Sequence, residues 1–481
     1  MSFASSVFAV FLIGVFLVYW YLPNRPQVWL LLSANCLFYA YWDWRFLALL
    51  FSLAAVNYVC GSQIDQADRP VRRRAWLLVS LIVSVGVLGY FKYYNFFVES
   101  FAAMLASAGF TVSSVTRHII LPLGLSYYTF QMLTYTLDIY RGQIKPTGSS
   151  LHFAVFAGFF GHIVAGPITR ARQFLPQFRK ERQPTPADLE VGLRRILLGL
   201  FKKLFIADTL ALYLVDPVFA APESYSAGLH WLAMAGYAVQ IYADFSGYSS
   251  MAVGVARLLG LKLPENFNFP YLAVNIAEFW RRWHITLSRW LRDYIWWALA
   301  KNIPFSGGWK IRLRSHFSLF VVFVICGLWH GASWTFVAWG ALHGIYIVTY
   351  EIWHRSRAAV ETKKSDNSWF SFGIVAAWLI TQAALLVSWV LFRSNSFDAF
   401  ASYLTGLFSG SGVKQLQLPM MVWGAFFAFA VDHIAGWLLE HRPTVKASVP
   451  AITAAVAYVA LILFLFNARP GQTSQFIYFQ F

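Results

Sequence analysis

One histidine lies in the middle of a strongly apolar stretch, and its side chain could do chemistry. His330 stands in VICGLWHGASWTF, flanked by Gly327 and Gly331 and preceded by Trp329. A polar side chain at membrane depth is costly unless it pairs or lines a cavity. A neutral imidazole can take a proton from a hydroxyl or attack a thioester, so we favour a catalytic residue for acyl transfer over a packing histidine.

A second histidine, His284, lies in the string FWRRWHITLSRW, inside a basic and aromatic region at 261–314. Aromatic and aliphatic residues recur at steps of three and four within 279–297, which predicts one amphipathic helix at the membrane interface. An exposed histidine there costs little, so the residues alone favour a surface side chain for His284 slightly.

The arginines of this region could bind an anionic substrate. An acyl donor such as a CoA thioester carries phosphate charges that cannot cross lipid and needs a cationic surface on the cytoplasmic side. The candidate residues are Arg281, Arg282, Arg289 and Arg292. We expect loss of Arg281 or Arg282 to raise the apparent KM for such a donor. The alternative is a plain membrane anchor.

The composition indicates that a membrane-embedded chain must position these residues. Of 481 residues, 58% are hydrophobic and only 12% are charged, with a mean hydropathy of +0.55. Too few charges are present to cover a water-facing surface, which excludes a soluble enzyme and a disordered chain. The net charge of +17 is typical of basic cytoplasmic loops, and we expect no nucleic-acid partner. The three cysteines lack metal-ligand spacing, so no metal site is predicted.

Apolar stretches near or above the length that crosses a bilayer, about 20 residues, predict an all-α polytopic membrane protein. We expect ten to thirteen transmembrane or re-entrant passes. The predicted spans are 3–22, 27–43, 46–62, 75–91, 119–140, 191–215, 229–256, 316–350, 370–393, 420–440 and 449–467.

Three further predictions concern how these spans are arranged. The stretch 316–350 is long enough for two passes or a broken helix and carries the buried histidine, His330. The segment 151–168 has basic residues at both ends and several glycines, which predicts a re-entrant segment. The arginine-rich loop at 69–74 follows the third span and should be cytoplasmic, which places the retained N-terminus on the far side of the membrane.

Several sequence motifs of soluble enzymes are missing, among them GxSxG, the Walker A loop, GxGxxG and HExxH. Nucleotide hydrolysis, zinc proteolysis and serine-hydrolase chemistry therefore have no support. A transporter or flippase, or a non-catalytic scaffold of a polysaccharide-export complex, would also show buried polar residues and cationic loops.

An ordered set of strings spans nearly the whole chain and resembles the membrane-bound O-acyltransferase (MBOAT) family, in its alginate O-acetylation branch. The strings are LPLGLSYYTFQMLTYTLDIYRG at 121–142, AGPITRARQFLPQF at 165–178, QIYADFSGYSSMAVGVARLLG at 240–260, PENFNFPYLAVNIAEFWRRWHITLSRWLRDYI at 264–295, GLWHGASWTFVAWGALHG at 327–344 and FIYFQF at 476–481. The resemblance implies a single membrane domain over 1–481, with a ring of helices around a thinned centre and a funnel.

The resemblance also implies the reaction and its residues. His330 corresponds to the catalytic histidine of the family and His284 to its second histidine. Asp244 and Tyr248, in 240–260, and Trp329 are expected to bind substrate. Asp244 has no partner within its own helix turns, so it should pair with another segment or line water.

The implied donor is cytoplasmic acetyl-CoA, as a substrate and with no permanently bound cofactor. The acceptor is a periplasmic or secreted polysaccharide such as alginate, acetylated directly or through a periplasmic SGNH-type acetyltransferase. Relatives that act on peptidoglycan, cellulose or teichoic acid leave the acceptor open. The implied location is the bacterial inner membrane, with many passes and a periplasmic N-terminus.

Overall fold

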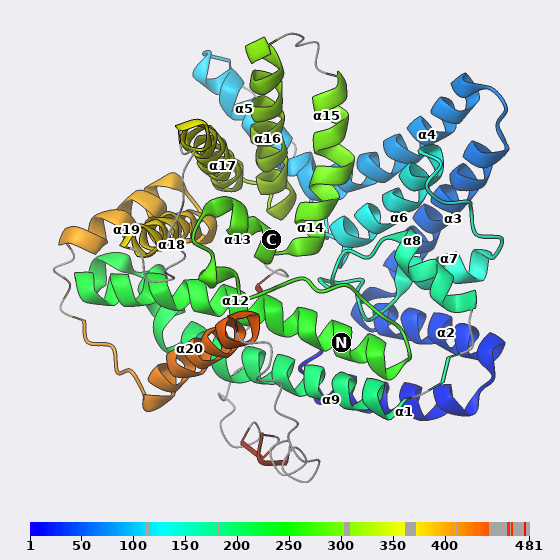
Figure 1. Cartoon of the computed structure of the whole chain (residues 1–481), viewed down its shortest axis with the longest axis horizontal. Helices are drawn as coiled ribbons and strands as arrows, with labels where there is room; N and C mark the ends of the chain where they lie inside the picture. Colours follow the sequence, from blue (N-terminus) through cyan, green and yellow to red (C-terminus); the bar gives the residue numbers. More distant parts are fainter. Residues whose placement is uncertain are drawn as a thin grey trace. The chain divides into compact units, whose positions relative to one another are not determined.

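The structure is a computed structural model, and it is built from α-helices with no β-strand among the residues it describes (Figure 1). It describes residues 1–110, 116–179, 182–183, 185–302, 308–360, 372–409, 412, 414–441, 459–461, 463–464 and 476–477. Within this part of the chain, five helices are long and apolar enough to cross a membrane, namely Arg45–Gln66, Pro70–Ser107, Ile311–His330, Phe372–Arg393 and Met420–His441. The predicted all-α polytopic membrane fold is confirmed. The ring, the funnel and the number of passes stay predictions.

The chain divides into two compact units, and we describe each by itself. The first comprises Met1–Ile196 and Tyr248–Pro264, and the second comprises Leu197–Gly247 and Glu265–Phe481. Two helices run across the division, α9 at Pro186–Phe201 and α12 at Ala227–Leu258. The single domain over 1–481 stays a prediction.

The first unit contains eight further helices among its described residues. They are α1 Ser6–Tyr21, α2 Asn24–Asp43, α3 Arg45–Gln66, α4 Pro70–Leu88, α5 Tyr94–Ser107, α6 Leu125–Tyr140, α7 Ser150–Gly158 and α8 Ala171–Phe174. Local signals start several of them. The Ser5 hydroxyl caps α1 by accepting the Phe8 N–H at 3.2 Å, and a proline opens α4, where its missing N–H costs nothing.

Buried polar side chains join α3, α4 and α6 of the first unit. Asn57 Nδ2 donates to Ser84 Oγ at 3.0 Å, and Ser80 Oγ donates to Asn57 Oδ1 at 2.8 Å. The Ser80 hydroxyl also lies 3.0 Å from Thr136 Oγ1. Because apolar faces gain little by associating in lipid, such hydrogen bonds hold membrane helices in register.

The segment predicted to be re-entrant is a short helix followed by irregular backbone. After α7 ends at Gly158, residues 159–170 are non-helical and buried. Gly124, with φ of +72°, packs so closely on this backbone that an added Cβ would meet the Ile163 carbonyl. Burial inside protein is the condition under which non-helical backbone is tolerated at membrane depth.

The second unit holds the remaining helices of the described chain. They are α10 Asp208–Leu210, α11 Asp216–Ala220, α13 Ile276–Arg282, α14 Ile285–Trp290, α15 Trp297–Asn302, α16 Gly308–His330, α17 Trp334–Val360, α18 Phe372–Arg393, α19 Phe397–Ser409 and α20 Met420–His441. π-helical turns at Lys202–Ala207, Ala211–Val215 and Leu291–Trp296 connect some of them, and another lies at Gly89–Tyr93 in the first unit. Short 3-10 turns occupy Leu175–Arg179, Pro222–Ser224 and Pro270–Leu272.

Most predicted spans correspond to helices. The stretch 316–350 is two helices, as one of its two interpretations predicted, and α16 ends at His330. The predicted span 119–140, however, is helical only from Leu125, and the helices α5 and α19 were not predicted. The predicted span 449–467 lies outside the described residues apart from 459–461 and 463–464.

The helices α16 and α17 lie side by side, and glycines let their backbones approach (Figure 1). A Cβ added at Gly340 would meet the Phe323 carbonyl and lie 3.1 Å from the Gly327 Cα. Small residues at such crossings are typical of membrane helix pairs. The contact fixes the end of α16, where His330 lies.

Gly340→Ala is therefore expected to lower the stability of the protein by about 1–3 kcal/mol, because the added methyl group overpacks this crossing. Thermal unfolding in detergent measures the effect. Gly86→Ala is the control, since no heavy atom lies within 4 Å of the position of its Cβ. Equal melting temperatures for the two variants would contradict the close contact.

Candidate active site

His330 is the last residue of α16 and is buried against three aromatic rings. His330 is only 4% exposed to solvent. Its ring centroid lies 5.0 Å from Trp329, 5.1 Å from Trp339 and 5.3 Å from Phe392. The helix ends here, and Gly331 follows at a position where an added Cβ would collide with the Phe336 ring. The imidazole therefore lies in an aromatic enclosure at a break between two helices.

His284 lies at a break between two short helices and is fully buried. The predicted continuous amphipathic helix over 279–297 is wrong, because α13 ends at Arg282 and α14 begins at Ile285. His284 has a left-handed backbone with φ of +41°, which costs a residue other than glycine on the order of 1–3 kcal/mol. Its exposure is 0%, which contradicts the predicted surface position. Burial lowers the pKa of His284 to about 3, so its imidazole is neutral at pH 7.

The structure brings the two histidines to the same tryptophan. The Trp329 ring centroid lies 5.9 Å from that of His284 and 5.0 Å from that of His330. Phe245 of α12 packs edge-on against His284 at 4.7 Å. Two buried imidazoles around one indole form an arrangement suited to proton transfer and to hydrogen bonding with a reacting hydroxyl.

Asn266 holds the backbone and the ring of His284. The Asn266 Oδ1 accepts the Thr286 N–H at 3.1 Å and the Thr286 hydroxyl at 2.8 Å. The same oxygen lies 3.2 Å from His284 Nδ1, and the Asn266 carbonyl accepts the Ile285 N–H at 2.9 Å. Sequence reasoning did not single out Asn266, because it lies 18 residues before His284.

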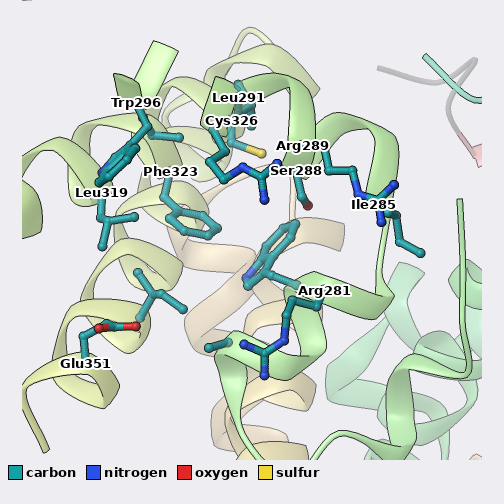
Figure 2. A pocket seen from close by; sticks show the side chains of 15 residues that line it. Arg281, Ile285, Ser288, Arg289, Leu291, Trp296, Leu319, Phe323, Cys326 and Glu351 are labelled. Carbon is teal, nitrogen blue, oxygen red and sulfur yellow. The ribbon is translucent and has the colours of Figure 1, made fainter. Parts of the chain in front are cut away.

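A cationic pocket of about 390 Å³ adjoins this site (Figure 2). Arg281, Arg289 and Arg292 contribute the positive charge, and Glu351 of α17 contributes one negative charge. Figure 2 shows Glu351 across the pocket from Arg281 and Arg289. The remaining lining is mostly apolar and includes Leu319, Val322, Phe323 and Cys326 of α16.

The α16 wall of the pocket ends one helical turn before His330, which does not itself line the pocket. Cys326 lines the pocket and precedes His330 by four residues. Residues four apart on a helix lie on one face, about 6 Å apart along the axis. A ligand that reached from the arginines to Cys326 would thus have that end within one helical turn of the histidine.

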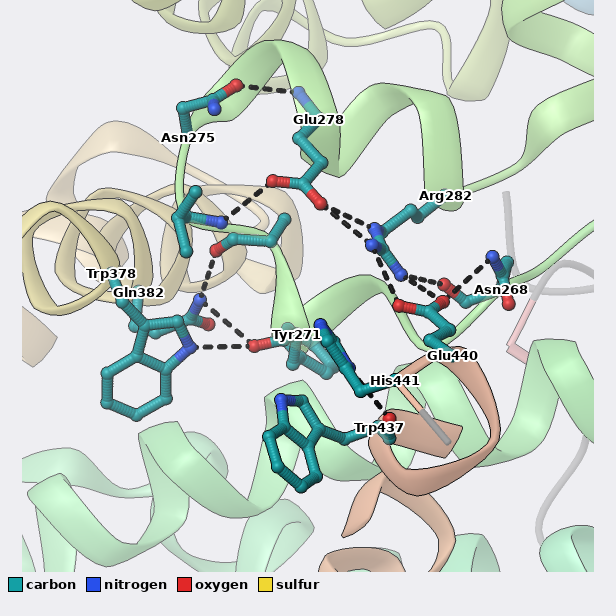
Figure 3. A network of polar contacts seen from close by, with 12 residues as sticks. Asn268, Tyr271, Asn275, Glu278, Arg282, Trp378, Gln382, Trp437, Glu440 and His441 are labelled. Carbon is teal, nitrogen blue, oxygen red and sulfur yellow. Dashed lines mark hydrogen bonds and ion pairs between the residues drawn. The ribbon is translucent and has the colours of Figure 1, made fainter. Parts of the chain in front are cut away.

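Arg282 lies in a different environment from Arg281 (Figure 3). It is not among the residues that line the pocket. Its guanidinium donates to Glu440 at 2.7 Å and 3.1 Å and to Glu278 at 2.9 Å. Glu278 also accepts the Val274 N–H at 3.2 Å. These bonds tie α13 to α20, as Figure 3 shows.

Arg282→Met is consequently expected to lower the stability of the folded protein. Two carboxylates lose their partner, which costs about 1–3 kcal/mol at this half-buried position. Thermal unfolding of the purified protein and the apparent KM for the donor should be measured together. A raised KM at unchanged stability would return Arg282 to the binding role that the sequence suggested.

Asp244 pairs with other segments of the second unit, as its lack of a partner within its own helix predicted. Lys203 Nζ lies 2.8 Å from Asp244 and 2.9 Å from Asp208. Asp244 Oδ2 also accepts the Ile477 N–H at 2.7 Å. All three charged side chains are at most 7% exposed. The triad holds a described part of the C-terminal segment, and its role in substrate binding stays a prediction.

Tyr248 belongs to the first unit, whereas the other candidate residues belong to the second. Its ring stacks on Phe3 with centroids 4.6 Å apart, and it is 5% exposed. A role for Tyr248 in substrate binding stays a prediction.

The sequence reasoning did not single out Trp339 and Phe392, the two rings that complete the enclosure of His330. Trp339 also lies 4.6 Å from His343. His330 ends α16 and His343 lies on α17, so the two histidines belong to different helices. Among the described residues, no group of three or more His, Cys, Asp or Glu side chains is placed to hold a metal ion.

Comparisons with known proteins identify the family. The model of the membrane-bound O-acyltransferase family matches residues 8–390, most of the chain. A probable alginate O-acetylase AlgI of Pseudomonas putida is 36% identical over the full length of both chains. Its counterpart in Pseudomonas syringae pv. tomato is 38% identical over 85% of this chain and 75% of its own length.

A relative named for another acceptor is almost as similar. The peptidoglycan O-acetyltransferase of Helicobacter pylori is 36% identical over 84% of this chain and 78% of its own length. The matched region contains both histidines and the arginines of the pocket. This chain belongs to the membrane-bound O-acyltransferase family and is a multi-pass membrane acyltransferase.

Proposed function

We propose that this protein takes an acetyl group from cytoplasmic acetyl-CoA and passes it across the membrane for O-acetylation of a periplasmic or secreted polysaccharide. Alginate is the acceptor that the relatives favour, reached directly or through a periplasmic SGNH-type acetyltransferase. The protein would lie in the bacterial inner membrane with its N-terminus in the periplasm. The observation that carries the proposal is the cationic pocket whose α16 wall ends one turn before His330.

The pocket suits the donor in charge and in polarity. Arg281, Arg289 and Arg292 match the phosphate groups of CoA, since guanidinium groups bind phosphate oxygens in paired hydrogen bonds. The apolar wall suits the uncharged arm that carries the thioester. With the phosphates held at the arginines, the arm extends along α16 toward His330.

The site supports either of two roles for His330. As a general base it would take the proton of the acceptor hydroxyl while that oxygen attacks the thioester carbonyl and the CoA thiolate leaves. As a nucleophile it would carry the acetyl group itself and then pass it to the hydroxyl. Burial against Trp329, Trp339 and Phe392 excludes water, which would otherwise hydrolyse the acetyl group.

Peptidoglycan is the second candidate acceptor. The similarity to the peptidoglycan O-acetyltransferase of Helicobacter pylori is nearly as high as that to the alginate O-acetylases. The donor pocket and His330 serve both acceptors equally. Analysis of acetyl esters in exopolysaccharide and in cell wall from a deletion strain distinguishes the two.

The double variant Arg281→Met and Arg289→Met is expected to raise the apparent KM for acetyl-CoA about tenfold or more, because each lost guanidinium removes charge-assisted hydrogen bonds to phosphate. The kcat should change little, since the arginines act on binding. Acetyl-transfer kinetics in membranes measure both constants.

Arg72→Met, which alters an exposed arginine of α4, is the control. An unchanged KM in the double variant would mean that the pocket does not bind the donor, and the arginines would then be a membrane anchor.

A further inference from the structure

We propose that Asn266 is a positioning residue that fixes His284 as the Nδ1–H tautomer, so that Nε2 carries the lone pair with which His284 accepts a hydrogen bond from the acceptor hydroxyl when His330 carries the acetyl group. The inference rests on the proposed function for that last step. The tautomer itself follows from the contacts of Asn266 alone.

The identity of the Asn266 oxygen is fixed by its backbone contact. An amide oxygen and an amide nitrogen look alike in shape, but only the oxygen can accept a hydrogen bond. The Thr286 N–H points at this atom from 3.1 Å, and a backbone N–H can only donate. The atom that it meets is therefore Oδ1.

The same oxygen decides which nitrogen of His284 bears the proton. His284 Nδ1 lies 3.2 Å from Asn266 Oδ1. Since the oxygen has no proton to give, Nδ1 must be the donor. In a neutral imidazole one nitrogen donates and the other accepts, which leaves the lone pair on Nε2.

The surroundings of the pair hold this geometry in place. Asn266 is 1% exposed and His284 is 0% exposed, so water does not compete for either group. The Asn266 carbonyl also accepts the Ile285 N–H, which secures the backbone on the far side of the left-handed His284 residue. One asparagine thus holds the backbone break and the ring together.

The alternative is that Asn266 only caps α14, because its Oδ1 accepts the Thr286 N–H near the start of that helix. Capping alone predicts a loss of stability in Asn266 variants with no effect on the imidazole. Our proposal predicts in addition that the tautomer of His284 and the kcat respond to the side chain at 266.

The direct test is ¹⁵N NMR of protein labelled at histidine in detergent. Bare and protonated ring nitrogens give separate signals, and a difference spectrum against His284→Gln isolates those of His284. We expect a protonated Nδ1 and a bare Nε2 in the wild type and in Asn266→Asp, which keeps an oxygen acceptor. In Asn266→Leu a population with protonated Nε2 should appear. A bare Nδ1 in the wild type would overturn the proposal.

The kinetic test compares the same variants. Asn266→Leu should lower kcat by about tenfold to a hundredfold, the range found when the hydrogen-bond partner of a metal-bound histidine is removed, at an unchanged KM for acetyl-CoA. Asn266→Asp should restore most of kcat. Thr286→Val, which removes the other side-chain bond to the same oxygen, is the control and should retain kcat. A wild-type kcat in folded Asn266→Leu would overturn the positioning role.

The two proposals fail in different ways. If the wild type shows the Nδ1–H tautomer but transfers no acetyl group, the proposed function fails and the assignment of the tautomer stands. If the wild type transfers acetyl groups but Nδ1 of His284 carries no proton, the inference on Asn266 fails and the proposed function stands.

Discussion

His330→Gln is expected to abolish O-acetylation of the polysaccharide while the protein remains in the membrane at its normal level. Glutamine fills most of the volume of the imidazole, so the enclosure of Trp329, Trp339 and Phe392 stays packed. It can neither take a proton at neutral pH nor form an acyl intermediate. Loss of a general base or nucleophile lowers the rate by about 10²–10⁴-fold or more. Acetyl esters released by alkali from isolated polysaccharide measure the effect.

The matched control alters a histidine on the surface. His118 is exposed, and His118→Gln should leave the acetyl content at the wild-type value. Immunodetection in isolated membranes checks that both variants accumulate equally. Full acetylation by the His330→Gln protein would remove His330 from the reaction, and a non-catalytic role for the protein would then explain the pathway.

Lys203→Met is expected to prevent accumulation of folded protein. Lys203 lies between Asp208 and Asp244, and removing it leaves two buried carboxylates near one another. Breaking a buried ion pair by removing one partner costs about 3–5 kcal/mol. That loss is a large part of the stability of a typical protein. Fluorescence-detected size-exclusion chromatography of solubilised membranes measures the yield of folded protein.

The neighbouring lysine is the control. Lys202 pairs with Asp432 at 3.1 Å, and the carboxylate of that pair is 25% exposed, so Lys202→Met should fold with a small loss of stability. The triple variant Lys203→Met, Asp208→Asn and Asp244→Asn should regain part of the yield, because it removes the buried charges together. A normal yield of Lys203→Met would contradict the account of this triad.

The sequence predicted those features of the site that depend on residues close to one another in the chain. A histidine inside an apolar stretch stands out by contrast, and His330 is buried at the helix break that its flanking glycines allowed. The two-helix interpretation of 316–350 was also available, because the stretch is too long for one pass. The apolar stretches likewise predicted most helices, since length and hydropathy are properties of a segment by itself.

Features set by distant residues could not be predicted in the same way. The periodicity of 279–297 favours one helix, but Asn266 holds His284 in a left-handed conformation that interrupts it. Arg281 and Arg282 are neighbours of the same type, yet Glu440, 158 residues away from Arg282, engages only one of them in the contacts described. Tertiary contacts of this kind leave no trace in a local pattern.

Release of free CoA from acetyl-CoA by purified protein in liposomes tests the central claim most directly. Wild-type protein, supplied with a soluble polysaccharide acceptor, should liberate CoA thiol in proportion to the acetyl ester formed. The His330→Gln protein, reconstituted in equal amount, should liberate none above the lipid background. Equal release by both proteins, or acetyl-CoA transported with its thioester intact, would contradict the claim that the acetyl group is transferred at His330.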